Sequence, residues 1–140
     1  MALRRSLSTA VAAVSLLAAA CAPVAAPPID LTDSLWRVAA IDGATTHPQA
    51  LVTVHFHDLD QATIESECFE LELGLQVETD GQGFGFEGTM ERATKDCDEA
   101  TSYEAERELE ALLGANAWSV IDLRTLELTG EHRVRLSQVY

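Results

Sequence analysis

Positive charge is scarce in this sequence. Its 140 residues contain nine Lys and Arg against 23 Asp and Glu, which gives a formal net charge of −14. A protein that binds nucleic acid needs a basic surface to neutralise the phosphates. The composition therefore argues against a nucleic-acid partner. It favours a cationic partner, such as a basic protein or metal ions, although solubility alone would also account for the charge.

Long apolar runs are missing as well, since a membrane-spanning helix needs about 20 apolar residues. The nearest candidate, residues 10–20, is shorter and leads into a Pro-rich stretch. It follows Arg4 and Arg5, which is the arrangement of a cleaved export signal. We therefore expect residues 1–20 to be a signal peptide.

Cysteine is rare, with three in the chain, and the first of them follows the signal directly. Residues 16–21 resemble the lipobox of bacterial lipoproteins, in which the cysteine is lipidated and becomes the mature N-terminus. The lipobox prefers leucine three residues before the cysteine, where this chain has Ala18. We expect lipidation at Cys21, with ordinary cleavage within residues 22–26 and a soluble periplasmic product as the alternative. Both routes lead to the bacterial cell envelope, facing the periplasm.

Beyond the signal, the chain divides into a linker and one domain. Residues 21–33 are rich in Pro and Ala and have no period, so we expect the lipidated cysteine and a tether there. Residues 34–140 are long enough for one domain with one core. Anionic headgroups would repel so acidic a domain, so its attachment to a membrane would depend on the lipid anchor.

Turn residues set the register of three hairpins, because only one alignment keeps apolar residues opposite one another. The first turn is centred on Leu59, the second is Asp80-Gly81, a typical two-residue hairpin turn, and the third is centred on Glu131. The expected partners are Val54 with Ile64 and Phe56 with Ala62; Val77 with Phe84, Leu75 with Phe86 and Leu71 with Met90; and Leu126 with Leu136 and Leu128 with Val134.

One segment, residues 98–114, has the periodicity of a helix. Its apolar residues form one stripe, and its glutamates lie largely off that stripe. Thr101 and Glu104 fit a capping box, and Gly114 is placed to end the helix. The whole pattern predicts an α+β fold, a strongly curved antiparallel sheet or partial β-barrel of about seven strands packed on one helix. The stripe is Ala105, Leu109, Leu112 and Leu113, and the glutamates are Glu104, Glu106, Glu108 and Glu110.

Cys68 and Cys97 remain once Cys21 is lipidated. In an oxidising compartment, two such cysteines are expected to form a disulfide. The bridge would close a loop of about 30 residues, worth about 3–4 kcal/mol in the chain-entropy description. A redox-active pair is the alternative, but the sequence has no Cys-x-x-Cys.

A weak metal candidate is formed by His55, His57 and Glu65. The two histidines point to the same side of one strand, and Glu65 lies diagonally across the hairpin. Two imidazoles and a carboxylate can hold zinc or copper, yet exposed histidines on strands are common. We expect no cofactor, because the G-x-G-x-x-G of residues 83–88 lies inside a strand rather than before a helix. No serine stands in a Gly-x-Ser-x-Gly elbow, so we expect no catalytic residue.

The order of elements and a few anchors resemble the META domain, or HslJ-like, family of small bacterial envelope proteins, which are often lipoproteins. The resemblance covers about residues 31–138. The opening strand with Trp36 looks like the family's first strand, Cys68 falls at its Gly-Cys-Asn segment, and residues 94–97 resemble its Thr-rich segment before the helix. Residues 67–69 depart from it, as Glu-Cys-Phe. The resemblance implies an antiparallel sheet curved around one helix, a link to envelope stress tolerance and no known catalytic residues.

These observations favour a function without catalysis. We expect an envelope lipoprotein domain, and not an enzyme, with a binding or stress-tolerance role in the periplasm. The alternative is an acidic inhibitor or scavenger of a cationic partner, which would be a basic protein such as a lysozyme, or metal ions.

Overall fold

The computed structural model describes residues 29–78 and 83–140. In these two ranges the chain forms nine strands and one helix. The expected signal peptide, Cys21 and the Asp80-Gly81 turn lie outside the described residues. The elements are β1 (Ser34–Ile41), β2 (Ala44–Thr45), β3 (Thr53–Phe56), β4 (Gln61–Glu65), β5 (Phe69–Val77), β6 (Phe84–Thr94), α1 (Glu99–Leu113), β7 (Ala115–Asp122), β8 (Thr125–Gly130) and β9 (Arg133–Gln138).

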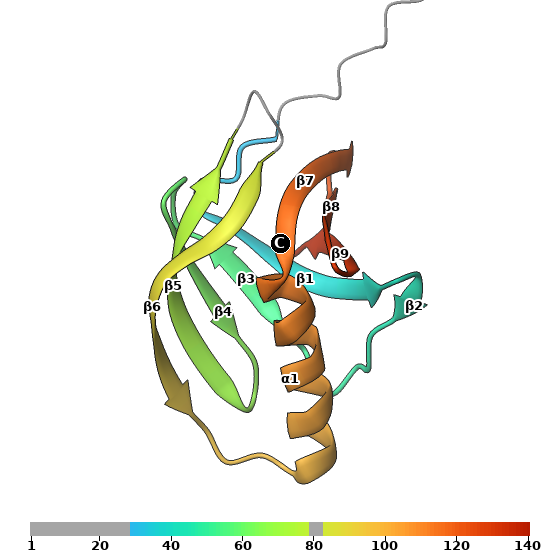
Figure 1. The fold of residues 1–140 in the computed structure, drawn as a ribbon. Coiled ribbons are helices and arrows are strands. Elements are labelled where there is room, and N and C mark those ends of the chain that lie inside the picture. The colour runs from blue at the N-terminus through green and yellow to red at the C-terminus, as the bar shows by residue number, and fades with distance from the viewer. Residues whose placement is uncertain (1–28, 79–82) are drawn as a thin grey trace, which may run out of the picture.

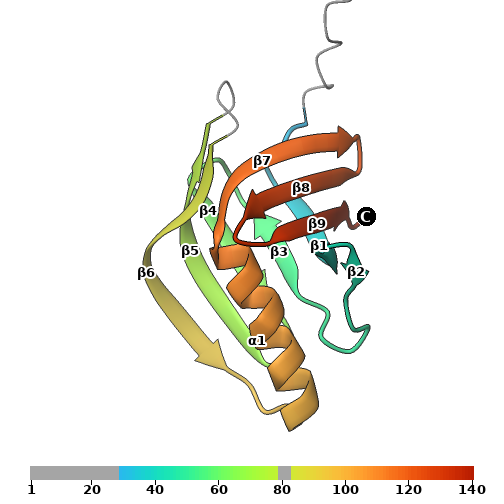
Figure 2. The same ribbon diagram turned by 45° about the vertical axis from the view of Figure 1, so that its right-hand side comes forward.

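The strands form one antiparallel sheet in the order β6-β5-β4-β3-β1-β9-β8-β7, with β2 paired to β1. The sheet curls on itself, and a bridge between Gly83 and Ala117 joins its two ends. The result is a nearly closed barrel with α1 along its open side (Figures 1 and 2). The antiparallel sheet and its helix agree with the sequence expectation. The strand number is nine rather than about seven, and it includes the two-residue strand β2, which pairs with the end of β1.

All the expected cross-strand pairs but one are confirmed. The exception is Leu71, which pairs with Arg92 rather than with Met90. The register shifts halfway along the β5–β6 hairpin, where β6 uses more residues than β5 and Gly88 adopts a φ of +93°. A bulge of this kind depends on a local backbone conformation that only glycine adopts easily. The alternation of apolar residues carries no sign of it.

The helix begins one turn earlier than the expected capping box. Asp98 is its N-cap, and the carboxylate accepts hydrogen bonds from the backbone N–H and the hydroxyl of Thr101, at 2.9 and 2.6 Å. The capping role predicted for Thr101 and Glu104 is therefore wrong, since aspartate satisfies the first turn better from the position before the helix. Gly114 is the C-cap, as expected. In the described parts of the chain, no helix is long and apolar enough to cross a membrane.

The core extends to residues that precede β1. Trp36 is fully buried, and its indole N–H donates to Ser34 Oγ at 2.8 Å, which satisfies the buried donor. Leu31 is also buried, and Ile29 packs against the core. These two apolar side chains precede the expected start of the domain at residue 34 and cover part of the core.

Cys68 and Cys97 form a disulfide, as predicted. The bridge joins the β4–β5 turn to the segment before α1. The backbone N–H of Lys95 donates to the carbonyl of Cys68 at 2.8 Å and strengthens the same connection. The start of α1 is thereby fixed to one end of the β5–β6 hairpin.

Candidate functional site

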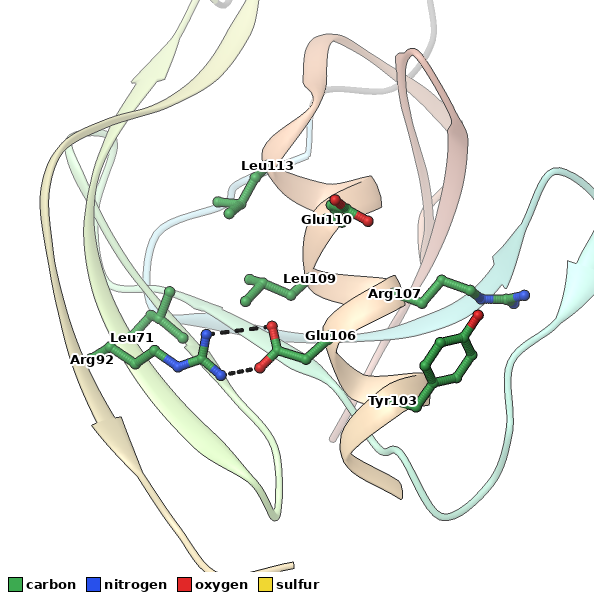
Figure 3. A pocket seen from close by; sticks show the side chains of 8 residues that line it. All are labelled: Leu71, Arg92, Tyr103, Glu106, Arg107, Leu109, Glu110 and Leu113. Atoms are coloured by element: carbon green, nitrogen blue, oxygen red, sulfur yellow. Dashed lines mark hydrogen bonds and ion pairs between the residues drawn. The ribbon is translucent and has the colours of Figure 1, made fainter. Parts of the chain in front are cut away.

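A hollow of about 460 Å³ lies between α1 and the β5–β6 hairpin (Figure 3). Its apolar floor consists of Leu71 from β5 with Leu109 and Leu113 from α1. The first two are buried in the core, and Leu113 is half-buried and packs against it. The second half of β6 runs apart from α1 in both ribbon views, which leaves room for the hollow. Its volume is that of an ordinary small-ligand pocket.

Arg92 spans the hollow from β6 to α1. Its guanidinium pairs with both carboxylate oxygens of Glu106, as the dashed lines in Figure 3 show. It also lies over the ring of Phe69, 5.0 Å from the ring centre. The two-pronged ion pair fixes the planar group, and the ring contact adds about 0.5–1 kcal/mol where it is exposed. Arg92 is therefore held in one position with its charge compensated.

The outer margin of the hollow is formed by Tyr103, Arg107 and Glu110 of α1. Tyr103 is 69% exposed, and Arg107 Nε lies 3.7 Å from a carboxylate oxygen of Glu104. The described residues of the lining include no serine, cysteine or histidine, the side chains that most often act as nucleophile or base. An apolar floor with a charged margin is instead suited to receive an apolar group that carries polar or charged neighbours.

The outer face of the same hairpin is crowded with glutamates. Glu72 of β5 lies directly opposite Glu91 of β6, and both side chains are exposed. No ion pair in residues 29–78 and 83–140 engages either of them. Like charges at facing positions destabilise a sheet. This face would therefore gain from a cation supplied by another molecule.

The structure brings together only part of the weak metal candidate. The rings of His55 and His57 lie side by side with centres 4.2 Å apart. Glu65 faces Thr53 across the hairpin, and its carboxylate pairs with Lys95 Nζ at 2.9 Å. Each histidine Nε2 also has a protein partner, Asp33 Oδ1 at 3.2 Å and Thr63 Oγ1 at 2.7 Å respectively. Among the residues that the structure describes, no three His, Cys, Asp or Glu side chains are placed to hold a metal ion.

Glu108 is a buried carboxyl that the sequence interpretation placed off the helix stripe. It is 1% exposed, and within the described residues neither of its oxygens has a hydrogen-bond partner of ordinary geometry. Burial raises the pKa of Glu108 to about 7, and the charge of Glu104 adds to this effect. The backbone N–H of Val52 and the charge of Arg107 oppose the rise in pKa without cancelling it.

β1 and β9 both contact α1, and among the described residues neither strand directs a charged side chain at this carboxyl. Their basic residues alternate with buried ones and are exposed, so they lie on the outside of the barrel. These are Arg37, Arg133 and Arg135. Glu108 is thus enclosed mainly by apolar groups, which favours its protonated form.

Sequence reasoning missed both Arg92 and Glu108. A signal for Glu108 was present, because Thr101, Ala105, Glu108 and Leu112 recur at the spacing of one buried helix row, and all four are buried. For Arg92 no signal existed, since its position opposite Leu71 follows from the bulge in β6.

Comparisons with known proteins inform the fold alone. No family model matches the chain, and no curated protein matches it. A solved structure of a DUF4847 family protein from Bacteroides vulgatus ATCC 8482 is similar, with a TM-score of 0.54 and 14% sequence identity. The similarity covers 76% of this chain and 93% of that one. It supports the curved sheet with one helix as a fold that another protein adopts.

Proposed function

We propose that this protein is a non-catalytic binding domain of the bacterial cell envelope, a META or HslJ-like lipoprotein anchored through Cys21 and facing the periplasm. The observation that carries the binding role is the hollow between α1 and the β5–β6 hairpin. It combines a buried apolar floor, a fixed Arg92–Glu106 pair and an exposed margin. The anchor and the stress-tolerance role rest on the sequence resemblances.

The scaffold around the hollow suits binding rather than chemistry. The disulfide fixes one end of α1 to the hairpin, and Arg92 ties the middle of α1 to β6. A cavity held open by such cross-links needs little reorganisation when a ligand enters, which favours affinity. Among the lining residues that the structure describes there is no serine, cysteine or histidine, the side chains on which most hydrolytic mechanisms depend.

Site-specific photo-crosslinking in intact cells tests this proposal. A photoreactive amino acid at Tyr103, at the margin of the hollow, is compared with the same group at Leu123 in the β7–β8 turn; the two native side chains are 69% and 66% exposed. We expect a discrete adduct from Tyr103 only, which Leu113→Glu removes. Equal adducts at both positions, or none, would refute the hollow as the site. Cys21→Ser should shift the chain from membranes to the soluble fraction if the anchor is correct.

A second candidate function is the capture of a cationic partner, such as a basic protein or metal ions. The facing pair Glu72 and Glu91 favours it, since both carboxylates are exposed and neither has an ion-pair partner in the described ranges. Binding to a basic protein such as lysozyme should be saturable and should weaken strongly with salt. An affinity that does not change with salt concentration, or no binding at low salt, would count against this function.

A further inference from the structure

The sheet ends at β6, and that end is open. One side of Phe84–Thr94 pairs with β5. On the other side, in the part of the chain that the structure describes, the sheet continues through an isolated bridge between Gly83 and Ala117. Within residues 29–78 and 83–140, no further backbone hydrogen bond reaches this edge. An edge strand presents a row of unpaired N–H and C=O groups, which another extended chain can use.

The two faces of this edge differ in chemistry. Toward the barrel interior lies the hollow, with Leu71, Leu109 and Leu113 at its floor. On the outer face Glu87 and Glu91 are exposed, and Glu72 stands across from Glu91. Successive side chains of a strand point to opposite faces. A strand added to β6 would therefore direct one set of side chains to the apolar hollow and the other set to the glutamates.

We propose that the β6 edge and the hollow together bind an extended peptide segment in which basic and apolar residues alternate. The backbone of the segment pairs with β6, its apolar residues enter the hollow, and its basic residues face Glu87 and Glu91. This inference rests on the proposed binding role of the hollow and names the class of its partner. The peptide supplies the cation that the facing pair Glu72 and Glu91 lacks among the described residues.

A second copy of the chain is a poorer occupant of the same edge. Pairing of β6 with its own copy would bring Glu87 and Glu91 of both chains onto one face, and facing carboxylates repel. The net charge of −14 opposes such association further. A basic peptide would instead place positive charges beside these carboxylates, so the repulsion would not arise.

The test uses the purified domain in its oxidised form and synthetic peptides of about eight residues, the length of an ordinary strand. The first peptide alternates lysine and valine, and the second has the same composition with all lysines in one half. We expect saturable binding of the alternating peptide, measured by calorimetry, and at least about tenfold weaker binding of the block peptide. Equal affinity for the two would mean attraction by charge alone and would overturn the proposal.

Backbone N-methylation then tests strand pairing directly. In an extended strand, alternate residues direct their N–H and C=O groups to the same side. One peptide is methylated on its valine amides and the other on its lysine amides. Pairing along one edge requires that one of the two loses binding while the other keeps it. Loss in both, or retention in both, contradicts edge pairing.

Charge reversal on the protein provides the matched control. Glu91→Lys, on the outer face of β6, should lower the affinity for the alternating peptide by about threefold to tenfold. Glu67→Lys removes the same charge from an exposed position in the β4–β5 turn and should leave affinity almost unchanged. Equal effects would indicate an unspecific charge response. If the crosslinks at Tyr103 persist while no alternating peptide binds, this inference fails and the binding role of the hollow stands; if both are lost, both fail.

Discussion

The surroundings of Glu108 are unfavourable for an ionised carboxylate. An ionised carboxylate without hydrogen bonds is costly to bury, so the group takes up a proton instead. With 1% exposure and no partner of ordinary geometry in the described residues, Glu108 follows this rule, and burial raises its pKa to about 7. A buried acid of this kind makes the stability of the domain depend on pH.

The direction of that dependence follows from linkage. In the unfolded chain Glu108 releases its proton near pH 4.5, whereas in the folded domain it keeps the proton to about pH 7. Its contribution is therefore fully present below pH 4.5 and is lost as the pH rises to 7. At about 1.4 kcal/mol per pH unit, the free energy of unfolding should fall by about 3 kcal/mol across this window. Urea denaturation at a series of pH values measures it.

Glu108→Gln should flatten that slope, because glutamine does not titrate. The matched control is Glu110→Gln, which removes an exposed carboxylate two residues further along the same helix. The difference between each variant and the parent, pH by pH, cancels the titration of the other acids. A Glu108→Gln profile parallel to that of the parent would show that Glu108 is not the responsible group.

Among the elements, the β5–β6 hairpin is shaped by its bulge. Gly88 has a φ of +93°, a region that an L side chain enters only with strain, and no atom lies within 4 Å of a Cβ built there. Gly88→Ala should therefore cost about 1–2 kcal/mol through the backbone alone. Gly85→Ala, on the same strand with open space and without a positive φ, should cost less. Equal losses in urea denaturation would argue against a conformational cause.

The same hairpin shows what could be predicted from the sequence and what could not. The partners nearest the turn, Val77 with Phe84 and Leu75 with Phe86, followed from the alternation of apolar residues and are confirmed. Beyond the bulge, the extra residues of β6 shift the register of the two strands, so the partner predicted for Leu71 was wrong. The hollow depends on that same change of register, since it places Arg92 opposite Leu71. Local patterns define local pairs, but they do not encode a site that forms where two elements separate.

At the scale of the whole molecule, α1 is the connection between the two end strands of the sheet. β1 joins the β3–β6 meander to the β7–β9 meander by pairing with both β3 and β9. The chain then crosses from β6 to β7 through α1, which lies along the seam between these two strands beside the bridge at Gly83 and Ala117 (Figure 2). The pairing of β1 with β9 joins segments from opposite ends of the domain, so no local pattern in the sequence indicated it.

The disulfide fixes this crossing at its start, and its removal should loosen the whole barrel. Cys68 and Cys97 are separated by 29 residues, a span that includes all of β5 and β6. Opening a loop of that size should lower the free energy of unfolding by about 3–4 kcal/mol in the chain-entropy description. Replacing both cysteines by serine and measuring urea denaturation against the oxidised parent checks this value.

A structural bridge and a redox-active pair predict different results for the reduced protein. Cys68 is 3% exposed, which limits the access of a reductant to its sulfur. Reduction in the native state should therefore be slow and should accelerate in urea, as the barrel opens. Alkylation after brief treatment with a mild reductant measures the rate. Rapid reduction of the folded domain, with no loss of stability in the double serine variant, would favour the redox-active pair and would leave the seam held by α1 and the Arg92–Glu106 pair.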